Sequence, residues 1–126
     1  AKFTAREVRR GKTYDIVLID PPKFGRGPAG ETWDLFTSLR PLLEDCAKLL
    51  APHHAALVLT VYAIRASTLA FGQLVEEVLG ARAGQLDVGE LIIREAAGRH
   101  AVPTSLFTRW TTAHNATPSN RVERSS

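Results

Sequence analysis

Two short apolar runs dominate the hydrophobic pattern of the chain. Residues 14–20 (Tyr-Asp-Ile-Val-Leu-Ile-Asp) and residues 55–61 (Ala-Ala-Leu-Val-Leu-Thr-Val) are rich in aliphatic and β-branched side chains. Continuous runs of this length, without a helical period, are typical of strands buried on both faces of a parallel sheet. We therefore predict a strand in each segment, and the first strand ends at Pro21-Pro22.

Helical periodicity follows each predicted strand. From Thr32 to about residue 50, apolar side chains recur every three or four residues, so we predict a helix that kinks or breaks at Pro41. Ser67 is a suitable N-cap for a second helix that ends near Leu79. The apolar stripe of the first helix comprises Trp33, Phe36, Leu39, Leu43, Cys46, Ala47 and Leu50.

The last third of the chain predicts a β-hairpin and then a tail. Residues 90–95 and 104–110 read as antiparallel strands on either side of a turn region at 96–103. Residues 111–126 are polar and lack periodicity, so we predict a flexible tail there. Residues 1–110 then form one α/β unit, in which strand–helix–strand crossovers make parallel pairs and the hairpin adds an antiparallel strand.

The strand at residues 14–20 poses a problem for a sheet made by this chain alone. Apolar strands of parallel sheets lie centrally, yet nothing earlier in the chain supplies a neighbour on its other side. An exposed apolar edge invites pairing with another chain. The chain also begins at Ala1 and contains no methionine. We expect the preceding half of the domain to be missing, with pairing to another chain as the alternative.

Composition and charge exclude several classes of protein. The 126 residues are 44% hydrophobic and 23% charged, as in ordinary globular domains, and no apolar run approaches the ~18 residues of a membrane span. Cys46 is the single cysteine, which excludes an intramolecular disulfide and favours a reducing, cytoplasmic compartment. The net charge is +3, and the basic excess lies in residues 1–12. That segment is either a solvated helix face or a binding site for a phosphate backbone.

Asp20-Pro21-Pro22-Lys23-Phe24 is the motif with the most chemical content. It follows a predicted strand, and ligands of open α/β sheets bind outside the carboxyl ends of the strands. Asp20 can accept hydrogen bonds from a substrate amine or a cofactor, and both stiff prolines offer carbonyl acceptors. Phe24 can stack on a flat ring. The alternative is a strand terminated by prolines, with Asp20 as a solvated cap.

With this motif the chain resembles the class I S-adenosylmethionine-dependent methyltransferases, and among them the bacterial large-subunit ribosomal RNA methyltransferases. Residues 1–110 are similar to the C-terminal half of their Rossmann-like domain. That half comprises a helix, here residues 3–10, and strands four to seven of the sheet order 3-2-1-4-5-7-6, with a terminal antiparallel hairpin. The resemblance implies S-adenosylmethionine as cofactor and a ribosomal RNA base as substrate. It also places the glycine-rich cofactor loop in the missing half, so we expect this chain alone to be inactive.

The resemblance and the position of the motif together assign candidate site residues. We expect Asp20, Pro21 and Pro22 to be catalytic, and Asp20 and Pro21 to contact the cofactor as well. The predicted substrate-binding residues are Lys23, Phe24, Tyr62 and Arg65. The last two follow the second strand and should reach the same rim as Asp20, although loop packing would also explain them.

The cysteine content bears on the chemistry. Cytosine-C5 methyltransferases use a cysteine nucleophile after strand four or five, but Pro21-Pro22-Lys23 and Thr60-Val61-Tyr62 stand there. Cys46 lies mid-helix and is predicted to be core. Nitrogen methylation fits better, because Asp20 and the carbonyl of Pro21 can accept the hydrogens of an amino group. The usual nitrogen-methylating pattern has an aromatic residue directly after the prolines, where this chain has Lys23.

Two other functions are compatible with the sequence. Residues 25–30 match G-x-G-x-x-G, and a truncated dinucleotide-binding domain would use these glycines. Five residues separate them from the strand and Pro28 lacks an N–H, so we interpret the segment as a flexible substrate loop. The other rival is a non-catalytic α/β interaction module whose partner pairs with the edge at 14–20. No residues have metal-ligand spacing, and the sequence leaves the oligomeric state open.

Overall fold

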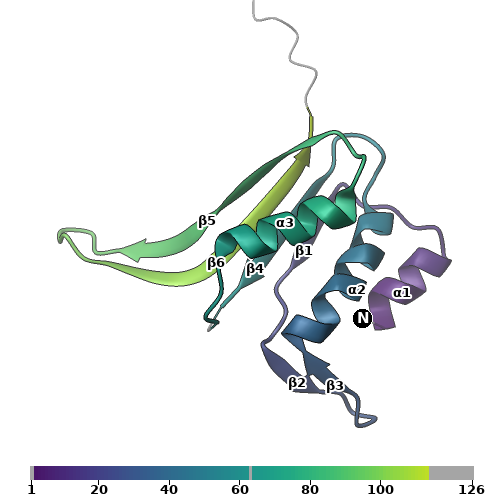
Figure 1. Ribbon diagram of the computed structural model, residues 1–126, viewed down its shortest axis with the longest axis horizontal. Helices are drawn as coiled ribbons and strands as arrows, with labels where there is room; N and C mark the ends of the chain where they lie inside the picture. Colours follow the sequence, from purple (N-terminus) through teal and green to yellow (C-terminus); the bar gives the residue numbers. More distant parts are fainter. Residues whose placement is uncertain (1, 63, 114–126) are drawn as a thin grey trace, which may run out of the picture.

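The computed structural model describes residues 2–62 and 64–113, which form three helices and six strands (Figure 1). In chain order the elements are α1 (Lys2–Arg9), β1 (Ile16–Ile19), β2 (Phe24–Arg26), β3 (Thr32–Asp34), α2 (Leu35–Leu49), β4 (Ala56–Val61), α3 (Thr68–Leu79), β5 (Gly84–Arg94) and β6 (Ala101–Thr112). Helix α1 confirms the helix expected before the first strand.

Four strands form the main sheet in the order β1-β4-β6-β5. Strand β1 pairs in parallel with β4, so that Ile16 lies beside Ala56 and Ile19 beside Leu59. Strand β6 is antiparallel to both β4 and β5. This order is the one that strands four to seven of a class I methyltransferase have, which confirms the predicted fold class. Strand β1 lies at an edge of the sheet, as the strand inventory predicted.

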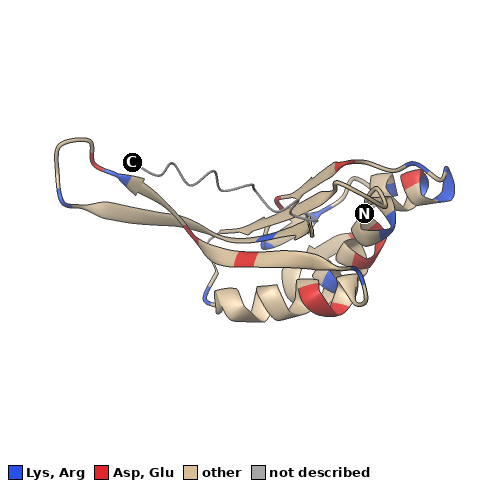
Figure 2. Ribbon diagram, turned by 90° about the horizontal axis from the view of Figure 1, so that it is seen from above, with Lys and Arg blue, Asp and Glu red and all other residues tan. Residues whose placement is uncertain are grey.

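The core lies between the sheet and the helices, on one face of the sheet. Along β4, Leu57, Leu59 and Val61 are buried, while the alternate residues are only half-buried. The buried set belongs to one cluster with Leu43 of α2 and Val75 of α3. Seen from above, the sheet carries its helices on one side (Figure 2).

Burial of β1 on both faces was predicted and is wrong. Val17 and Ile19 face the helices, but Ile16 and Leu18 are 69% and 68% exposed on the opposite face. The segment is apolar on both faces, but this chain supplies helices to only one face of the sheet. The other face of β1 is therefore exposed rather than buried. A second apolar layer is absent from the described part of the chain.

Local capping explains where two helices begin. The carboxylate of Asp34 accepts hydrogen bonds from the N–H groups of Phe36 and Thr37 at the start of α2. The hydroxyl of Ser67 accepts one from the N–H of Leu69, which confirms the predicted cap of α3. Helix α2 runs through Pro41 as one element, so of the two predicted alternatives, a kink or a break, the break is wrong.

The segment after the Asp-Pro-Pro motif differs from the prediction. Residues 24–34 were expected to be a loop followed by a helix from Thr32, but they form a short antiparallel hairpin of β2 and β3. Trp33, which the helical stripe included, lies on β3 and opposite Gly25. The three-residue strands carry no apolar alternation, so local periodicity does not reveal them.

The terminal hairpin is confirmed and is longer than predicted. Strand β5 begins at Gly84 rather than at residue 90, and β6 extends to Thr112. Residues 111 and 112, assigned to the tail, therefore belong to the strand, because they pair with Ala56 and with Gln85 and Gly84. Ala113 follows β6 and donates a hydrogen bond of 3.2 Å to the carbonyl of Ala83, and the rest of the predicted tail, residues 114–126, lies outside the described residues.

Helix α1 is tied to the chain that enters β1. The carboxylate of Glu7 is buried and accepts a hydrogen bond of 2.9 Å from the hydroxyl of Tyr14 and one of 3.2 Å from Arg10. The bond from Tyr14, together with Arg10 and Arg6, lowers the pKa of Glu7 below its usual value. The same bond raises the pKa of Tyr14.

Candidate active site at the carboxyl end of β1

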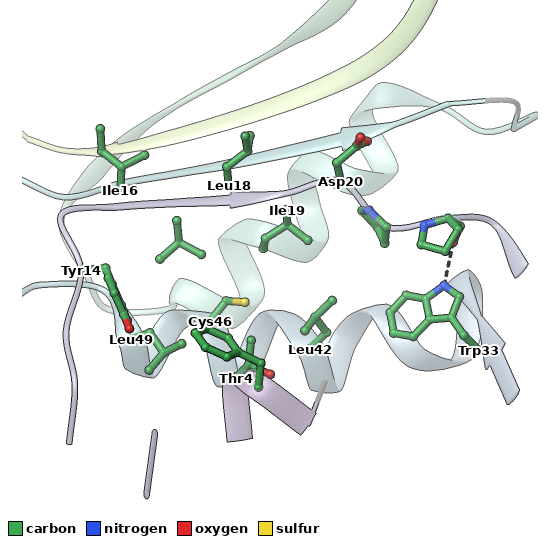
Figure 3. Close-up of a pocket in the computed structure, with 14 residues that line it drawn as sticks. Thr4, Tyr14, Ile16, Leu18, Ile19, Asp20, Trp33, Leu42, Cys46 and Leu49 are labelled. Atoms are coloured by element: carbon green, nitrogen blue, oxygen red, sulfur yellow. Dashed lines mark hydrogen bonds between the residues drawn. The ribbon is translucent and has the colours of Figure 1, made fainter. Parts of the chain in front are cut away.

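A cavity of about 470 Å³ runs along the exposed edge of β1 and reaches its carboxyl end (Figure 3). Its walls come from β1, α1 and α2, and they include Leu18, Ile19, Leu42 and Cys46. Asp20, Pro21 and Pro22 line its end together with Trp33. The structure thus places the Asp-Pro-Pro segment at a hollow of the surface, on the rim that α/β folds use for ligands.

Asp20 lies directly after β1 and is exposed. In Figure 3 its carboxylate points to the same side of the strand as Leu18, away from α2. The hydroxyl of Thr60, on the neighbouring strand β4, donates a hydrogen bond of 2.7 Å to Oδ1 of Asp20. The second carboxylate oxygen, Oδ2, has no hydrogen-bond partner among the described residues.

The two prolines have different surroundings. Pro21 is buried and Pro22 is exposed. The indole Nε1 of Trp33 donates a hydrogen bond of 2.6 Å to the carbonyl oxygen of Pro22 (Figure 3). The carbonyl of Pro22 thus already accepts one hydrogen bond, whereas that of Pro21 accepts none from the described residues. Sequence reasoning missed Trp33 as a site residue because its apolar spacing matched the helix.

Lys23 and Phe24 continue from the motif into β2. The backbone carbonyl of Lys23 accepts a hydrogen bond of 3.0 Å from the N–H of Leu35, which joins the segment to the start of α2. The ammonium of Lys23 lies 5.3 Å from the centre of the Phe24 ring, and that ring is 63% exposed. The aromatic face is thus at the surface, where a planar group can stack.

Tyr62 and Arg65 lie at the same end of the sheet as Asp20, since they follow the carboxyl end of β4. They line a different cavity, of about 310 Å³, together with Glu90 of β5 and Thr104 of β6. The structure therefore places Asp20 and this pair on one rim but in separate hollows.

Cys46 lines the large cavity from α2, with only 2% of its surface exposed. Burial raises the pKa of its thiol to about 11, with a smaller contribution from Asp45. A thiol held in its protonated form is a poor nucleophile at neutral pH. The placement agrees with the core role expected from the sequence.

The glycines at 25–30 lie on β2 and in its turn to β3 rather than at the start of a helix. The N–H groups of this turn are used within it: Gly27 donates to the carbonyl of Glu31, Gly30 to that of Gly27, and Ala29 to the Glu31 carboxylate. A phosphate cradle needs such groups aimed at the ligand.

No helix within residues 2–62 and 64–113 is long and apolar enough to cross a membrane. No cluster of three or more histidine, cysteine, aspartate or glutamate side chains there is arranged to hold a metal ion. His53 and His54 line a cavity at the opposite end of β4 from Asp20.

Comparisons with known proteins add an independent result. A SAM-dependent methyltransferase from Agrobacterium tumefaciens is 47% identical to this chain, with a TM-score of 0.83, over 89% of this chain and 37% of that one. A protein described as a methyltransferase and solved in complex with SAH is 19% identical (TM-score 0.64; 86% and 29% covered). A protein from Streptococcus mutans described as a SAM-dependent methyltransferase is 16% identical (TM-score 0.63; 88% and 28%).

The more distant two structures support the fold alone. No model of a protein family matches the chain, and none of the curated proteins does. The chain spans little more than a third of the length of the Agrobacterium protein, 37%. Close identity over most of the chain and a shared fold make it a relative of the class I S-adenosylmethionine-dependent methyltransferases, with the Rossmann-like architecture of one part of such a domain.

Proposed function

We propose that this chain is the acceptor-binding part of an S-adenosylmethionine-dependent methyltransferase that methylates a nitrogen of an RNA base. The observation that carries the proposal is the placement of Asp20-Pro21-Pro22 at the carboxyl end of β1, beside a cavity, in a fold shared with methyltransferases. The relative named above is SAM-dependent, so the same cofactor is proposed here.

The chemistry follows from two acceptors that receive no hydrogen bond from the described residues, Oδ2 of Asp20 and the carbonyl of Pro21. Bound S-adenosylmethionine supplies the methyl group. Oδ2 of Asp20 and the carbonyl of Pro21 accept the two hydrogens of an amino group, which holds its nitrogen in place for attack. The new N–C bond would replace the C–S bond of the methyl donor, so that S-adenosylhomocysteine leaves, and Oδ2 of Asp20 would take the proton that the nitrogen loses. Asp20 and Pro21 also lie at the rim where cofactors of α/β folds bind. Because the thiol of Cys46 is buried and protonated, a covalent route through it is disfavoured.

Charge and aromatic exposure support RNA as the substrate. Helix α1, which borders the cavity through Phe3 and Thr4, carries most of the basic residues of the segment 1–12. In Figure 2, ribbon segments of Lys and Arg, with segments of Asp and Glu between them, lie at the end of the molecule that carries the N label. Basic residues bind phosphate groups, and the exposed ring of Phe24 offers a stacking surface for a base. Tyr62 and Arg65, in the adjacent hollow, are proposed to contact the same substrate.

The open edge of β1 supports a further part of the proposal. The outer edge of β1 lacks a strand in the described residues, and Ile16 and Leu18 expose apolar surface beside it. We propose that the remaining part of the domain adds a strand at this edge and a layer over this face. That part would carry the rest of the cofactor site, so the 126 residues alone are expected to be inactive.

The rivals explain less of the geometry. A dinucleotide site at residues 25–30 lacks the helix start and the available N–H groups that it needs. An interaction module would use the edge of β1 but leaves the Asp-Pro-Pro segment unexplained. Calorimetry on a full-length protein containing this chain tests the choice. Binding of S-adenosylmethionine without binding of NAD is expected, and the opposite result would overturn the proposal.

A further inference from the structure

Two hydrogen bonds from outside the Asp20–Pro22 segment hold its two ends. The hydroxyl of Thr60, on β4, donates to Oδ1 of Asp20 over 2.7 Å. The indole of Trp33, on β3, donates to the carbonyl of Pro22 over 2.6 Å. The donors come from separate elements, and both reach acceptors in the proposed site.

The geometry of the sheet explains how Thr60 reaches Asp20. In the parallel register Ile19 lies beside Leu59, so the next residues along, Asp20 and Thr60, are also neighbours. Their side chains project from the same face, opposite to the buried Ile19 and Leu59. A threonine at this point of β4 is therefore in reach of the carboxylate without any change in the backbone.

Packing does not fix the orientation of the carboxylate or of the second proline. Asp20 and Pro22 are both exposed, and only Pro21 between them is buried. An exposed aspartate rotates freely about its side-chain bonds unless a hydrogen bond holds it. The bond from Thr60 supplies that restraint for Asp20, and the bond from Trp33 ties the backbone carbonyl of Pro22 to β3.

We propose that Thr60 and Trp33 are positioning residues for methyl transfer. By occupying Oδ1 of Asp20 and the carbonyl of Pro22, they leave Oδ2 and the carbonyl of Pro21 as the acceptors that lack a partner in the described part of the chain. They thereby hold the carboxylate and the backbone of the segment in one orientation, which fixes the direction in which Oδ2 and the carbonyl of Pro21 meet the substrate amino group. This inference rests on the proposed function.

The chain offers close variants for a test. Thr60→Val keeps the shape of the side chain and removes the donor, whereas Thr60→Ser keeps the donor. Trp33→Phe keeps an aromatic ring and removes the indole N–H. Thr111→Val is a matched control, because Thr111 is a half-buried threonine of β6 beside Ala56, at the far end of β4.

Steady-state kinetics on a full-length protein, with S-adenosylmethionine and ribosomal RNA, measure the effect. Thr60→Val and Trp33→Phe are expected to lower kcat by roughly 10- to 100-fold with little change in the KM for S-adenosylmethionine. Thr60→Ser and Thr111→Val are expected to stay near wild type. Circular dichroism checks that each variant is folded. Wild-type kcat in a folded Thr60→Val protein would overturn the role of Thr60.

Crystal structures of the same variants give a readout that does not depend on turnover. Asp20 should occupy one rotamer in the wild type and in Thr60→Ser, and more than one in Thr60→Val. An unchanged single rotamer in Thr60→Val would overturn the inference whether or not RNA is methylated. An ordered Asp20 in a wild-type protein that transfers no methyl group would contradict the proposed function instead.

Discussion

Leu18 and Ile19 are consecutive residues of β1 whose side chains have opposite surroundings: Leu18 is 68% exposed, and Ile19 is 6% exposed. The difference follows from the alternation of side chains along a strand, since Ile19 meets the helices and Leu18 does not. An apolar residue as exposed as Leu18, beside the equally exposed Ile16, marks a surface that favours a covering layer.

Alanine substitutions in β1 test this account. In the 126-residue chain, Ile19→Ala should lower the free energy of unfolding by about 2–5 kcal/mol, because it opens a cavity in the core. Leu18→Ala should stay within about 0.5 kcal/mol of wild type. Urea denaturation followed by circular dichroism measures both values.

The same Leu18→Ala substitution should behave differently in a full-length protein. If a further layer covers this face in the full-length protein, Leu18→Ala should lower the free energy of unfolding by about 2 kcal/mol or more. A loss as small as in the 126-residue chain would mean that the face stays open, and it would contradict the proposed arrangement.

The pairing of Glu7 with Tyr14 predicts a pH dependence of stability. The hydrogen bond from Tyr14, with Arg10 and Arg6, lowers the pKa of Glu7 from 4.5 in the folded state. A lowered carboxyl pKa contributes stability above the unfolded value, and this contribution is lost as the pH falls below about 4.5 towards the folded value. Glu7→Gln should therefore lose less stability than wild type between pH 7 and pH 3.

Urea denaturation at the two pH values measures that difference, and Glu76→Gln serves as a control on an exposed glutamate of α3. Equal acid sensitivity of wild type and Glu7→Gln would refute the role of Glu7. At high pH the sign reverses for Tyr14. Its pKa is raised from 10.0, so the stability that it contributes is lost only as the pH rises through that raised value.

Cys46 provides a test of the non-covalent route. Its burial and its raised pKa, about 11, predict that iodoacetamide modifies the thiol much more slowly in the folded protein than in urea. Cys46→Ala should keep methyl transfer near the wild-type rate in a full-length protein. Loss of transfer in a folded Cys46→Ala variant would favour a cysteine nucleophile instead.

Much of the fold could be predicted from local pattern. The strands at 14–20, 55–61, 90–95 and 104–110 and the helix capped by Ser67 all occur, because apolar runs and caps are properties of neighbouring residues. The hairpin of β2 and β3 could not be predicted in this way. Its strands have three residues each, and they are held by pairing between Gly25 and Trp33 that has no periodic signature.

The candidate site was predictable only in part. Asp20 and Pro21 were identified from their position after a strand, and the structure places them beside a cavity. Thr60 and Trp33 were missed, because their roles depend on the register of β1 with β4 and on the β2–β3 hairpin. Thr60 lies 40 positions from Asp20 in the sequence, and Trp33 lies 11 positions from Pro22. Tertiary structure rather than local sequence therefore sets these two contacts.

The most direct test of the central claim is methyl transfer by a full-length protein in wild-type and Asp20→Ala form. S-adenosylmethionine with a labelled methyl group is incubated with ribosomal RNA, and the label retained in RNA is counted. The wild type should label RNA, and Asp20→Ala should be slower by roughly 100-fold or more while it remains folded, since Asp20 is exposed. Labelling by Asp20→Ala at the wild-type rate, or no labelling by wild type, would contradict the account.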